Sequence, residues 1–271
     1  MSAQELVDVL DIELLDTNLY RGRNLSDPGF RRLYGGQVCA QAVIAAARTV
    51  PDGRHLHSLH GYFLRAGQVD RPVLYHVDRD RDGGSFSARH VVARQNGDAI
   101  FTLVASFHVD EPGGRYAATV MPTDVPEPDE LGETPDVPVF ASFDVRAPRV
   151  PDVPWQPGSI PVPRMWIRMR DPIPSGRLLH TAIGAFVSDI TCGWGVATTP
   201  EIPFGGSSLD HALWIHEQCD MNEWHLIDSW PVAASGARGL YEGAIFRRDG
   251  TLVASFAQEA LLRPPTPDTR A

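Results

Sequence analysis

The strongest constraint on the fold is a set of short segments that occurs twice. LVASF stands at residues 103–107 and again at 252–256. Two further pairs of similar segments occur in the same order, LHGYFL with DHALWI and SAR with GAR. The offset is 151 residues between His60 and His211 of the first of these pairs, and 149 for the SAR/GAR and LVASF pairs. Ordered matches at a nearly constant offset predict a duplicated domain.

Both halves have the same predicted layout, a helix followed by a run of strands. In the first half, GGQVCAQAVIAAARTV has apolar spacing near 3.6 and predicts a helix that begins near Gly36. Four strand-like runs follow it, HLHSLHGYFL, PVLYHVDRD, SFSARHVVAR and AIFTLVASFHV. In the second half, the strand-like RMWIRM and the helical SGRLLHTAIGAFVSDI precede SSLDHALWIHE, EWHLIDSWPV, ARGLYEGAIFR and LVASFAQEALLR. The turns QNGD and RRDGT predict hairpins. This order predicts an α+β fold in which a sheet wraps around a helix, twice.

Proline marks the boundary between the halves. Fourteen of the 23 prolines fall between Pro112 and Pro174, in a stretch without a strong periodic pattern. We therefore predict an N-terminal domain over 1–110, a Pro-rich linker and surface loop over 111–163, and a C-terminal domain over 164–271. Within the linker, FASFDVR has the pattern of a short strand.

Charge and composition exclude several classes of function. The formal net charge of −10 repels polyanions, so we expect no nucleic-acid partner. All 24 basic residues are arginine, which excludes Schiff-base chemistry and a P-loop because both need a lysine amine. Any phosphate on a ligand must then be bound by arginine, backbone N–H groups or helix ends.

Location and cofactors follow from what the motifs lack. The chain has no run of about 18 apolar residues, which predicts no membrane span, and its acidic start lacks the features of a signal peptide. Three widely spaced cysteines suit a reduced cytoplasm. The calcium-loop-like DRDRDG has Arg89 where a bidentate Glu is required, and His55 and His57 have no neighbouring carboxylate. We therefore expect no metal and no cofactor.

The stretch GGSSLDHALWIHE places Ser208, Asp210 and His211 close together, which is suggestive of a nucleophilic hydrolase. In a continuous strand, alternate residues face opposite sides of the sheet. Ser208 and Asp210 then point one way and His211 the other. The alternation predicts that Ser208 and His211 form no local nucleophile–base pair.

Several blocks together resemble one known family. They are LYGGQVCAQAVIAA, LHSLHGYFLRAG, GGSFSARHVVARQNG, FVSDIT, SLDHALWIH, NEWHLIDS, SGARG and VASFAQEALLR. In this order they are similar to the acyl-CoA thioesterase II (TesB-like) family, which has the double hotdog fold. The resemblance extends from about Leu19 to Arg263 and is weakest across the Pro-rich linker. It implies two tandem hotdog units, each a long helix wrapped by an antiparallel sheet.

The resemblance also implies a reaction and the residues that perform it. The family hydrolyses fatty acyl-CoA to free fatty acid and coenzyme A, with an Asp, a Thr or Ser, and a Gln that orient a water. The matching residues here are Asp189 of VSD, Ser208 before the DH pair and Gln258 of FAQE. Asp189 falls near the C-terminal end of its predicted helix, where the helix dipole disfavours a carboxylate. The repeat alignment places Val109 opposite Gln258 and His57 opposite Ser208, which suggests a single water-orienting set in the second half.

Three further residues are candidates for substrate contact. The paired glycines of YGGQ begin a helix, and backbone amides there suit an oxyanion. We expect Gly36 and Gln37 to cap the thioester carbonyl; the alternative, that the glycines only form the turn into the helix, is about equally favoured. His57 is a candidate for contact with substrate or water, with a structural histidine as the more common outcome.

Two other functions remain open from the sequence. A hydratase or dehydratase of 3-hydroxyacyl-CoA shares the hotdog fold but uses an Asp and a His in a D-x-N-P-x-H-like motif, which does not occur in the sequence. A non-catalytic acyl-CoA binding protein is opposed by the retention of all three polar positions. By analogy with other hotdog assemblies, we also expect a homo-oligomer.

Overall fold

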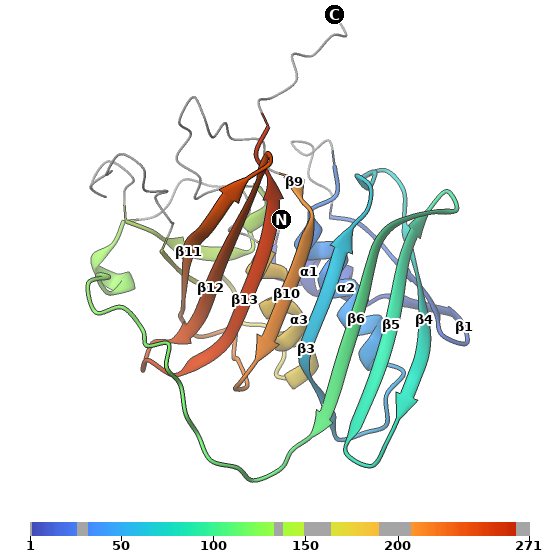
Figure 1. The fold of residues 1–271 in the computed structure, drawn as a ribbon, viewed down its shortest axis with the longest axis horizontal. Coiled ribbons are helices and arrows are strands. Elements are labelled where there is room, and N and C mark those ends of the chain that lie inside the picture. Colours follow the sequence, from blue (N-terminus) through green and yellow to red (C-terminus); the bar gives the residue numbers. More distant parts are fainter. Residues whose placement is uncertain (1, 26–31, 133–137, 149–163, 190–206, 264–271) are drawn as a thin grey trace, which may run out of the picture.

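The computed structural model describes residues 2–25, 32–132, 138–148, 164–189 and 207–263 (Figure 1). The first-half elements are α1 (Ala3–Leu10), β1 (Glu13–Asp16), β2 (Leu19–Gly22), α2 (Gly35–Ala47), β3 (Arg54–Phe63), β4 (Val73–Asp82), β5 (Phe86–Gln95) and β6 (Asp98–Val109). Two short 3₁₀ turns follow, η1 (Pro128–Glu130) and η2 (Pro138–Phe140). The second-half elements are β7 (Phe143–Arg146), β8 (Met165–Met169), α3 (Arg177–Ser188), β9 (Ser207–Ser208), β10 (Asp210–Ile215), β11 (His225–Ser235), β12 (Arg238–Arg247) and β13 (Leu252–Leu261).

The described strands form one continuous sheet, in which corresponding strands of the two halves follow in the same sequence from either edge to the centre. The order is β1-β2-β4-β5-β6-β3-β10-β13-β12-β11-β8-β7, with β9 paired to β13. In each half the helix is followed by four strands with corresponding neighbours, β3 to β6 and β10 to β13, and the second half has the short β9 in addition. The halves join where β3 and β10 pair antiparallel. Both long helices lie on one side of this sheet, behind it in Figure 1. The predicted α+β double hotdog fold is confirmed.

Strand order, rather than the short sequence matches, establishes the equivalence of the halves. His60 is exposed on the outer face of the sheet, whereas His211 is buried on the inner face. Arg89 pairs with Ala105, the alanine of LVASF in β6. The corresponding alanine in β13, Ala254, pairs with Ile245 rather than with Arg238. These two predicted matches are therefore wrong as structural equivalents, because the hairpins of the two halves have different lengths and a constant offset cannot hold. The Ala and Phe of LVASF point inward in both halves, since Ala105, Phe107, Ala254 and Phe256 are all buried in the main core, whereas Leu103 lies in that core and Leu252 does not.

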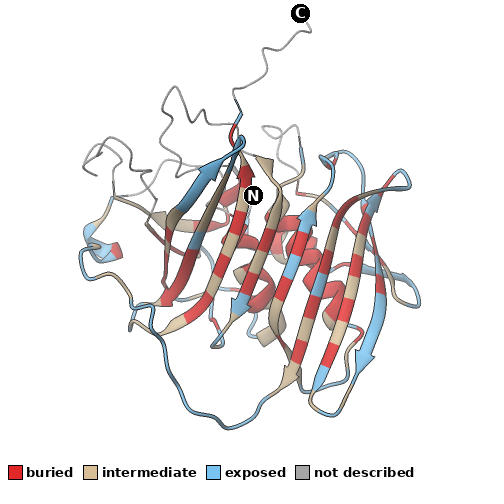
Figure 2. Cartoon of the chain, in the orientation of Figure 1, coloured by how far each residue is buried: buried red, intermediate tan, exposed pale blue. Residues whose placement is uncertain are grey.

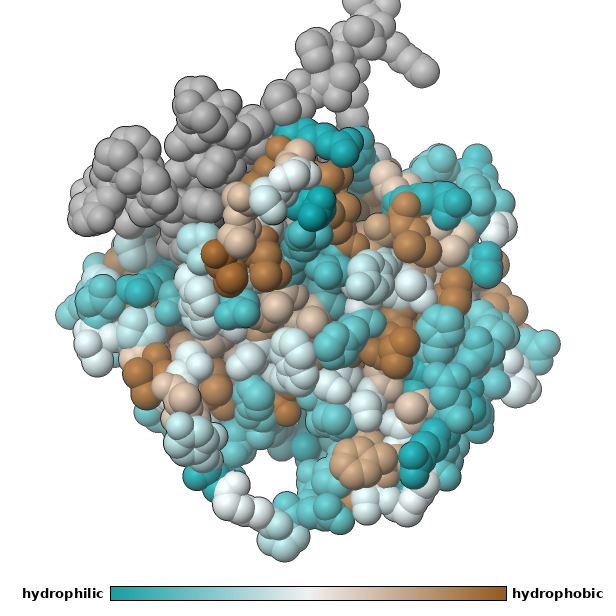
Figure 3. Space-filling model, viewed as in Figure 1, coloured by the Kyte–Doolittle hydropathy of each residue, from teal (hydrophilic) through white to brown (hydrophobic). Residues whose placement is uncertain are grey.

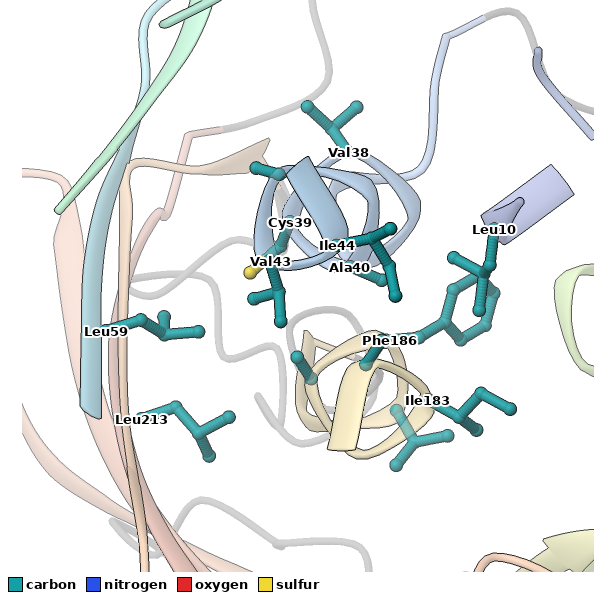
Figure 4. Packing of buried hydrophobic residues seen from close by; sticks show 14 of the residues in the cluster. Leu10, Val38, Cys39, Ala40, Val43, Ile44, Leu59, Ile183, Phe186 and Leu213 are labelled. Atoms are coloured by element: carbon teal, nitrogen blue, oxygen red, sulfur yellow. The ribbon is translucent and has the colours of Figure 1, made fainter. Parts of the chain in front are cut away.

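Small residues let α2 lie deep in the core. Every residue from Gly36 to Ala46 is buried, and alanines make up much of the helix surface. Figure 4 shows α2 and α3 side by side, with Leu59 of β3 and Leu213 of β10 facing them from the sheet. The strands alternate between buried and more exposed residues (Figure 2), as expected for a sheet with one covered face.

The Pro-rich segment is more than a connection. Its predicted strand FASFDVR is confirmed as β7, which pairs with β8 at the edge of the sheet. Met121, Val125 and Leu131 pack on a small second core that includes Trp166 and Phe246. The segment therefore covers apolar residues on the outer face of the second-half sheet. The helix α1 and the edge strands β1 and β2 were not predicted. In α1 the helical spacing of the buried Ala3, Leu6, Val9 and Leu10 was an available signal, whereas β1 is exposed throughout and has no alternation.

The contact between the two helices depends on a glycine. A Cβ atom added to Gly36 would lie 2.3 Å from the backbone oxygen of Phe186 in α3. A side chain at this position would push the helices apart, since the neighbouring atom is backbone and cannot rotate away.

We expect Gly36→Ala to lower the free energy of unfolding by about 1–3 kcal/mol through overpacking. The matched control is Gly184→Ala in α3, where the new Cβ would lie 3.5 Å from the Cys219 sulfur, an ordinary contact. That variant should be neutral or stabilised, because Ala has the higher helix propensity. Urea unfolding at equilibrium measures both, and equal stability of the two variants would contradict the close helix packing.

Candidate active site

The start of α2 meets the end of α3 at a buried carboxylate. Asp189 is the C-cap of α3 and is 3% exposed. A Cβ atom added to Gly35, the first residue of α2, would lie 2.6 Å from the Asp189 Oδ2 atom. The Tyr34 hydroxyl donates a hydrogen bond of 2.8 Å to the Phe186 carbonyl beside it. The carboxylate at the unfavourable end of α3 is thus placed against the first turn of α2, where N–H groups and the helix dipole favour a negative charge.

Two further polar side chains converge on this carboxylate. The Gln258 Nε2 atom donates to Asp189 Oδ1 at 2.7 Å, and the Ser208 hydroxyl donates to the same oxygen at 3.3 Å. Gln258 is fully buried on the inner face of β13, and Ser208 lies in β9. The structure therefore brings together the three residues that were predicted from separate segments. We refer to Asp189, Ser208 and Gln258 as the Asp189 cluster.

A β-bulge directs Ser208 toward the cluster. Ser208 pairs with Ala260 of β13, whereas Ala212 pairs with Ala257, so the register shifts by one residue between β9 and β10. At the shift, the Leu209 N–H donates to the Glu259 carbonyl, and the Asp210 carboxylate accepts from the Glu259 N–H. An inserted residue of this kind reverses the alternation of side chains.

The prediction that Ser208 and His211 face opposite sides is therefore wrong, since both point to the inner face. They still do not form the nucleophile–base pair of a serine hydrolase, for a different reason. The two ring nitrogens of His211 are engaged elsewhere: Nδ1 lies 2.7 Å from Gln258 Oε1 and Nε2 lies 2.7 Å from the Ser188 hydroxyl.

His211 is the polar residue of this site that sequence reasoning assigned only a structural role. It is 1% exposed, and burial lowers its pKa to about 4 despite the opposing effect of the hydrogen bond to Gln258. The imidazole is consequently neutral at pH 7. A polar residue at an inward, otherwise apolar strand position was the available sequence signal, but the bulge hid which face it occupies.

The described cysteines are not activated as nucleophiles. Cys39 lies one helical turn after Gly35, and burial together with the negative charge of Asp189 raises the pKa of its thiol far above the usual value. Burial likewise raises the pKa of Cys219 to about 12. A thiol that stays protonated is a poor nucleophile. Cys192 lies outside the described residues.

The three predicted contact residues have different surroundings. Gly36 lies at the helix contact described above, next to the Asp189 cluster. The Gln37 side chain is used structurally: its Oε1 accepts from the Leu25 N–H at 3.1 Å and its Nε2 donates to Asn24 Oδ1 at 3.1 Å. The backbone N–H groups of both residues belong to the first turn of α2, which faces Asp189.

His57 is not brought to the cluster. It hydrogen-bonds the Ser106 hydroxyl at 2.8 Å and contacts the rings of Phe86 and His108. The opposite end of β3 lies at the site, where the Phe63 ring is close to Gly35. The equivalence of His57 with Ser208 in the repeat alignment is also not supported by the strand pairing.

Within the described ranges, no group of three or more His, Cys, Asp or Glu residues is arranged to hold a metal ion. In the same part of the chain, no helix combines the length and the apolar character needed to cross a membrane.

The fold and the Asp189 cluster define a class of protein, a double hotdog enzyme with a polar site at the junction of its halves. Residues 25–108 match the family model of the acyl-CoA thioesterase N-terminal domain, and residues 122–262 match that of the C-terminal domain. Acyl-coenzyme A thioesterase 8 of Rattus norvegicus is 37% identical over 95% of this chain and 88% of its own length. Acyl-CoA thioesterase 2 of Haemophilus influenzae is 32% identical over 95% of this chain and 96% of its own.

Solved structures agree with these relatives. The crystal structure of acyl-CoA thioesterase II TesB2 from Mycobacterium marinum superposes with a TM-score of 0.82 at 36% identity, covering 98% of this chain and 99% of that one. A hot dog fold protein of unknown function from Alicyclobacillus acidocaldarius, at 18% identity and a TM-score of 0.77, supports the fold alone. The chain belongs to the acyl-CoA thioesterase family and is a thioester hydrolase, which confirms the resemblance inferred from the sequence.

The lowered pKa of His211 predicts a loss of stability in acid. The unfolded chain takes up a proton on this histidine near pH 6.5, but the folded protein does so only near pH 4. Its contribution to stability is therefore complete above pH 6.5 and decreases as the pH falls toward 4. Between pH 7.5 and 5, we expect the wild type to lose about 2 kcal/mol more of its unfolding free energy than His211→Asn, which cannot titrate. Urea unfolding at the two pH values measures the difference, and an identical pH dependence would show that His211 is not buried as a neutral ring.

Proposed function

We propose that this protein hydrolyses fatty acyl-CoA to free fatty acid and coenzyme A by direct attack of a water held by Asp189, Ser208 and Gln258. One observation carries the proposal. Side chains from β9 and β13 donate to a single oxygen, Oδ1 of Asp189 at the end of α3, in a buried position at the junction of the two halves.

Each group has a distinct task in the reaction. Asp189 accepts a proton from the water while the oxygen of the water attacks the thioester carbonyl carbon. The tetrahedral intermediate then collapses with cleavage of the C–S bond, and the departing sulfur takes the proton back from Asp189. Ser208 and Gln258 orient the carboxylate and the water through uncharged hydrogen-bonding groups.

In the proposed reaction, the first turn of α2 stabilises the oxyanion. We retain the backbone N–H groups of Gly36 and Gln37 as the proposed donors, because developing negative charge is favoured at a helix start. Gly35 has no side chain, and a Cβ atom there would collide with both Asp189 and Phe63. The absence of a side chain at Gly35 lets the start of α2 lie directly against the carboxylate.

Covalent catalysis fits the geometry less well. Ser208 contacts a carboxylate rather than a free imidazole nitrogen, and the Cys39 thiol is held in its protonated form. Hydrolysis without an acyl-enzyme is therefore favoured. The relatives named above are thioesterases, so the comparisons favour neither the hydratase hypothesis nor the non-catalytic binding hypothesis.

Asp189→Ala tests the reaction and its base together. We expect kcat for free-thiol release from acyl-CoAs of different chain lengths to fall by roughly 10²–10⁴-fold, the usual contribution of a general base. Thermal unfolding establishes that the variant is folded. A wild type inactive on every acyl-CoA would refute the reaction, whereas a fully active Asp189→Ala would refute only the assigned base.

Ser208 has a matched control in its neighbour. Ser207 lies in the same short strand, and its hydroxyl accepts from Arg32 rather than contacting Asp189. Ser208→Ala should lose most of kcat and Ser207→Ala should retain it. An acyl group trapped on Ser208 by quenching and mass spectrometry would replace the water mechanism with a covalent one.

The wider setting of the enzyme is also part of the proposal. The unpaired thiols of Cys39 and Cys219 suit a reduced cytoplasm, and the net charge of −10 opposes a nucleic-acid partner. A homo-oligomer is supported by the outer face of the sheet (Figure 3), where Tyr62, Val104 and Trp214 are exposed near the junction of the halves.

We expect light scattering to give a mass of two or more chains of 29.7 kDa. Trp214→Glu, on the outer face, should shift the protein toward the monomer because a charge opposes burial in an apolar interface. Tyr116→Glu is the control, since Tyr116 is 92% exposed and lies in the segment after β6, away from the sheet strands. A wild type that is monomeric at every concentration would contradict the proposal.

A further inference from the structure

A buried chain of hydrogen bonds continues from the Asp189 cluster to a residue that the proposed reaction does not use. Asp189 Oδ1 is bound by Gln258 Nε2, Gln258 Oε1 lies 2.7 Å from His211 Nδ1, and His211 Nε2 lies 2.7 Å from the Ser188 hydroxyl. All four side chains are at most 3% exposed. The chain leaves α3 at Asp189 and returns to it at Ser188, the residue before.

The carboxylate determines the orientation of the Gln258 amide. An ionised carboxylate is only an acceptor, so the amide must present its nitrogen to Asp189. The amide oxygen then necessarily faces His211. Because this oxygen is only an acceptor, His211 must present a hydrogen on Nδ1.

The remaining ring nitrogen determines the direction of the Ser188 hydroxyl hydrogen. A neutral imidazole carries one hydrogen, so His211 Nε2 has a lone pair and needs a donor. Ser188 can supply it by directing its single hydroxyl hydrogen to the ring rather than to the Ala185 carbonyl, which lies 2.9 Å away and competes for the same hydrogen. Burial disfavours the doubly protonated ring, in line with the lowered pKa of His211. The Ser188 hydrogen is therefore directed to the ring at neutral pH.

We propose that His211 is a positioning residue for thioester hydrolysis: as the Nδ1–H tautomer, with its Nε2 atom accepting from Ser188, it holds the Gln258 amide with its nitrogen toward Asp189. The inference rests on the proposed function, because it gives the orientation of Gln258 a catalytic consequence. Rotation of the amide by half a turn would place Oε1 against the carboxylate, where two acceptors repel each other. His211 opposes this rotation, since a reversed amide would direct an N–H at the ring N–H.

Removing the donor should lower turnover without weakening substrate binding. For His211→Leu we expect kcat for acyl-CoA hydrolysis to fall roughly 10- to 100-fold, less than the 10²–10³-fold typical of a lost oxyanion donor, with KM within about twofold. His211→Asn carries a short amide that can again donate to Gln258 Oε1, and it should recover most of kcat. A purely structural role would predict equal losses in the two variants.

His216 provides the matched control. It follows the same strand and its Nε2 lies 2.9 Å from the Ser255 hydroxyl, but it is exposed on the outer face. His216→Leu should keep the wild-type kcat. If His211→Leu also keeps it, or if the folded Leu and Asn variants lose activity equally, the positioning role is overturned.

The tautomer can be observed directly in the wild type. In ¹⁵N-labelled protein, the imidazole signals absent from His211→Asn belong to His211, and we expect a protonated Nδ1 and an unprotonated Nε2. Ser188→Ala removes the donor to Nε2 but leaves Gln258 Oε1 facing Nδ1, so Nδ1 should stay protonated in this variant. A protonated Nε2 in the wild type at pH 7 would overturn the inference even if His211→Leu failed to fold.

The two levels of proposal fail separately. An inactive wild type refutes the proposed reaction and a fully active Asp189→Ala refutes its assigned base, although in both cases the tautomer still reports on the hydrogen-bond chain. An active wild type that depends on Asp189 but not on His211 refutes only the positioning role.

Discussion

The close packing of α2 against α3 is the constraint on which the site depends. Gly36 lets the start of α2 approach the Phe186 carbonyl, and Gly35 then lies against Asp189. A carboxylate at the end of a single helix would be both dipole-unfavoured and costly to bury. The start of α2 provides a dipole end that favours the carboxylate, and its N–H groups offset part of the free-energy cost of burying the charge. The two halves therefore have to be joined before the Asp189 carboxylate has a favourable environment.

The continuous sheet fixes how those helices meet. Antiparallel pairing of β3 with β10 joins the halves about a pseudo-twofold axis, so the two helices are carried to the same face. Near this seam, the bulge between β9 and β10 brings Ser208 and His211 to the same inner side. A regular strand would have directed one of them to the outer face. The local irregularity thus supplies both a residue that binds Asp189 and one that binds Gln258.

Sequence patterns predicted the elements that have strong periodicity and apolar faces, including α2, α3 and the strands of both meanders. They also predicted which of Asp189, Ser208 and Gln258 to examine, but only through family resemblance, because a lone Asp, Ser or Gln has no distinguishing pattern. The bulge at Leu209 could not be predicted, since strand register is set by the partner strand and not by local sequence. For the same reason His211 was assigned to the wrong face relative to Ser208. The match between Arg89 and Arg238 failed because the hairpin lengths of the two halves have diverged.

The two halves differ at the position of the active-site carboxylate. Asp189 is the C-cap of α3, whereas the C-cap of α2 is Arg48, which pairs with Asp11 at 2.6 Å. At the end of α2, the first half has the fully buried Arg89, which donates to the Thr49 carbonyl and hydroxyl and pairs with Asp82 at 2.7 Å. A cation at a helix C-terminus is favoured by the dipole, and Arg89 also donates to the Thr49 carbonyl just beyond the helix. The end of α2 therefore carries a guanidinium whose partners are Thr49 and Asp82. The end of α3 instead carries a carboxylate that accepts hydrogen bonds from Ser208 and Gln258. Among the described residues, the position that matches Asp189 therefore holds an arginine, which cannot supply the base that the proposed reaction requires.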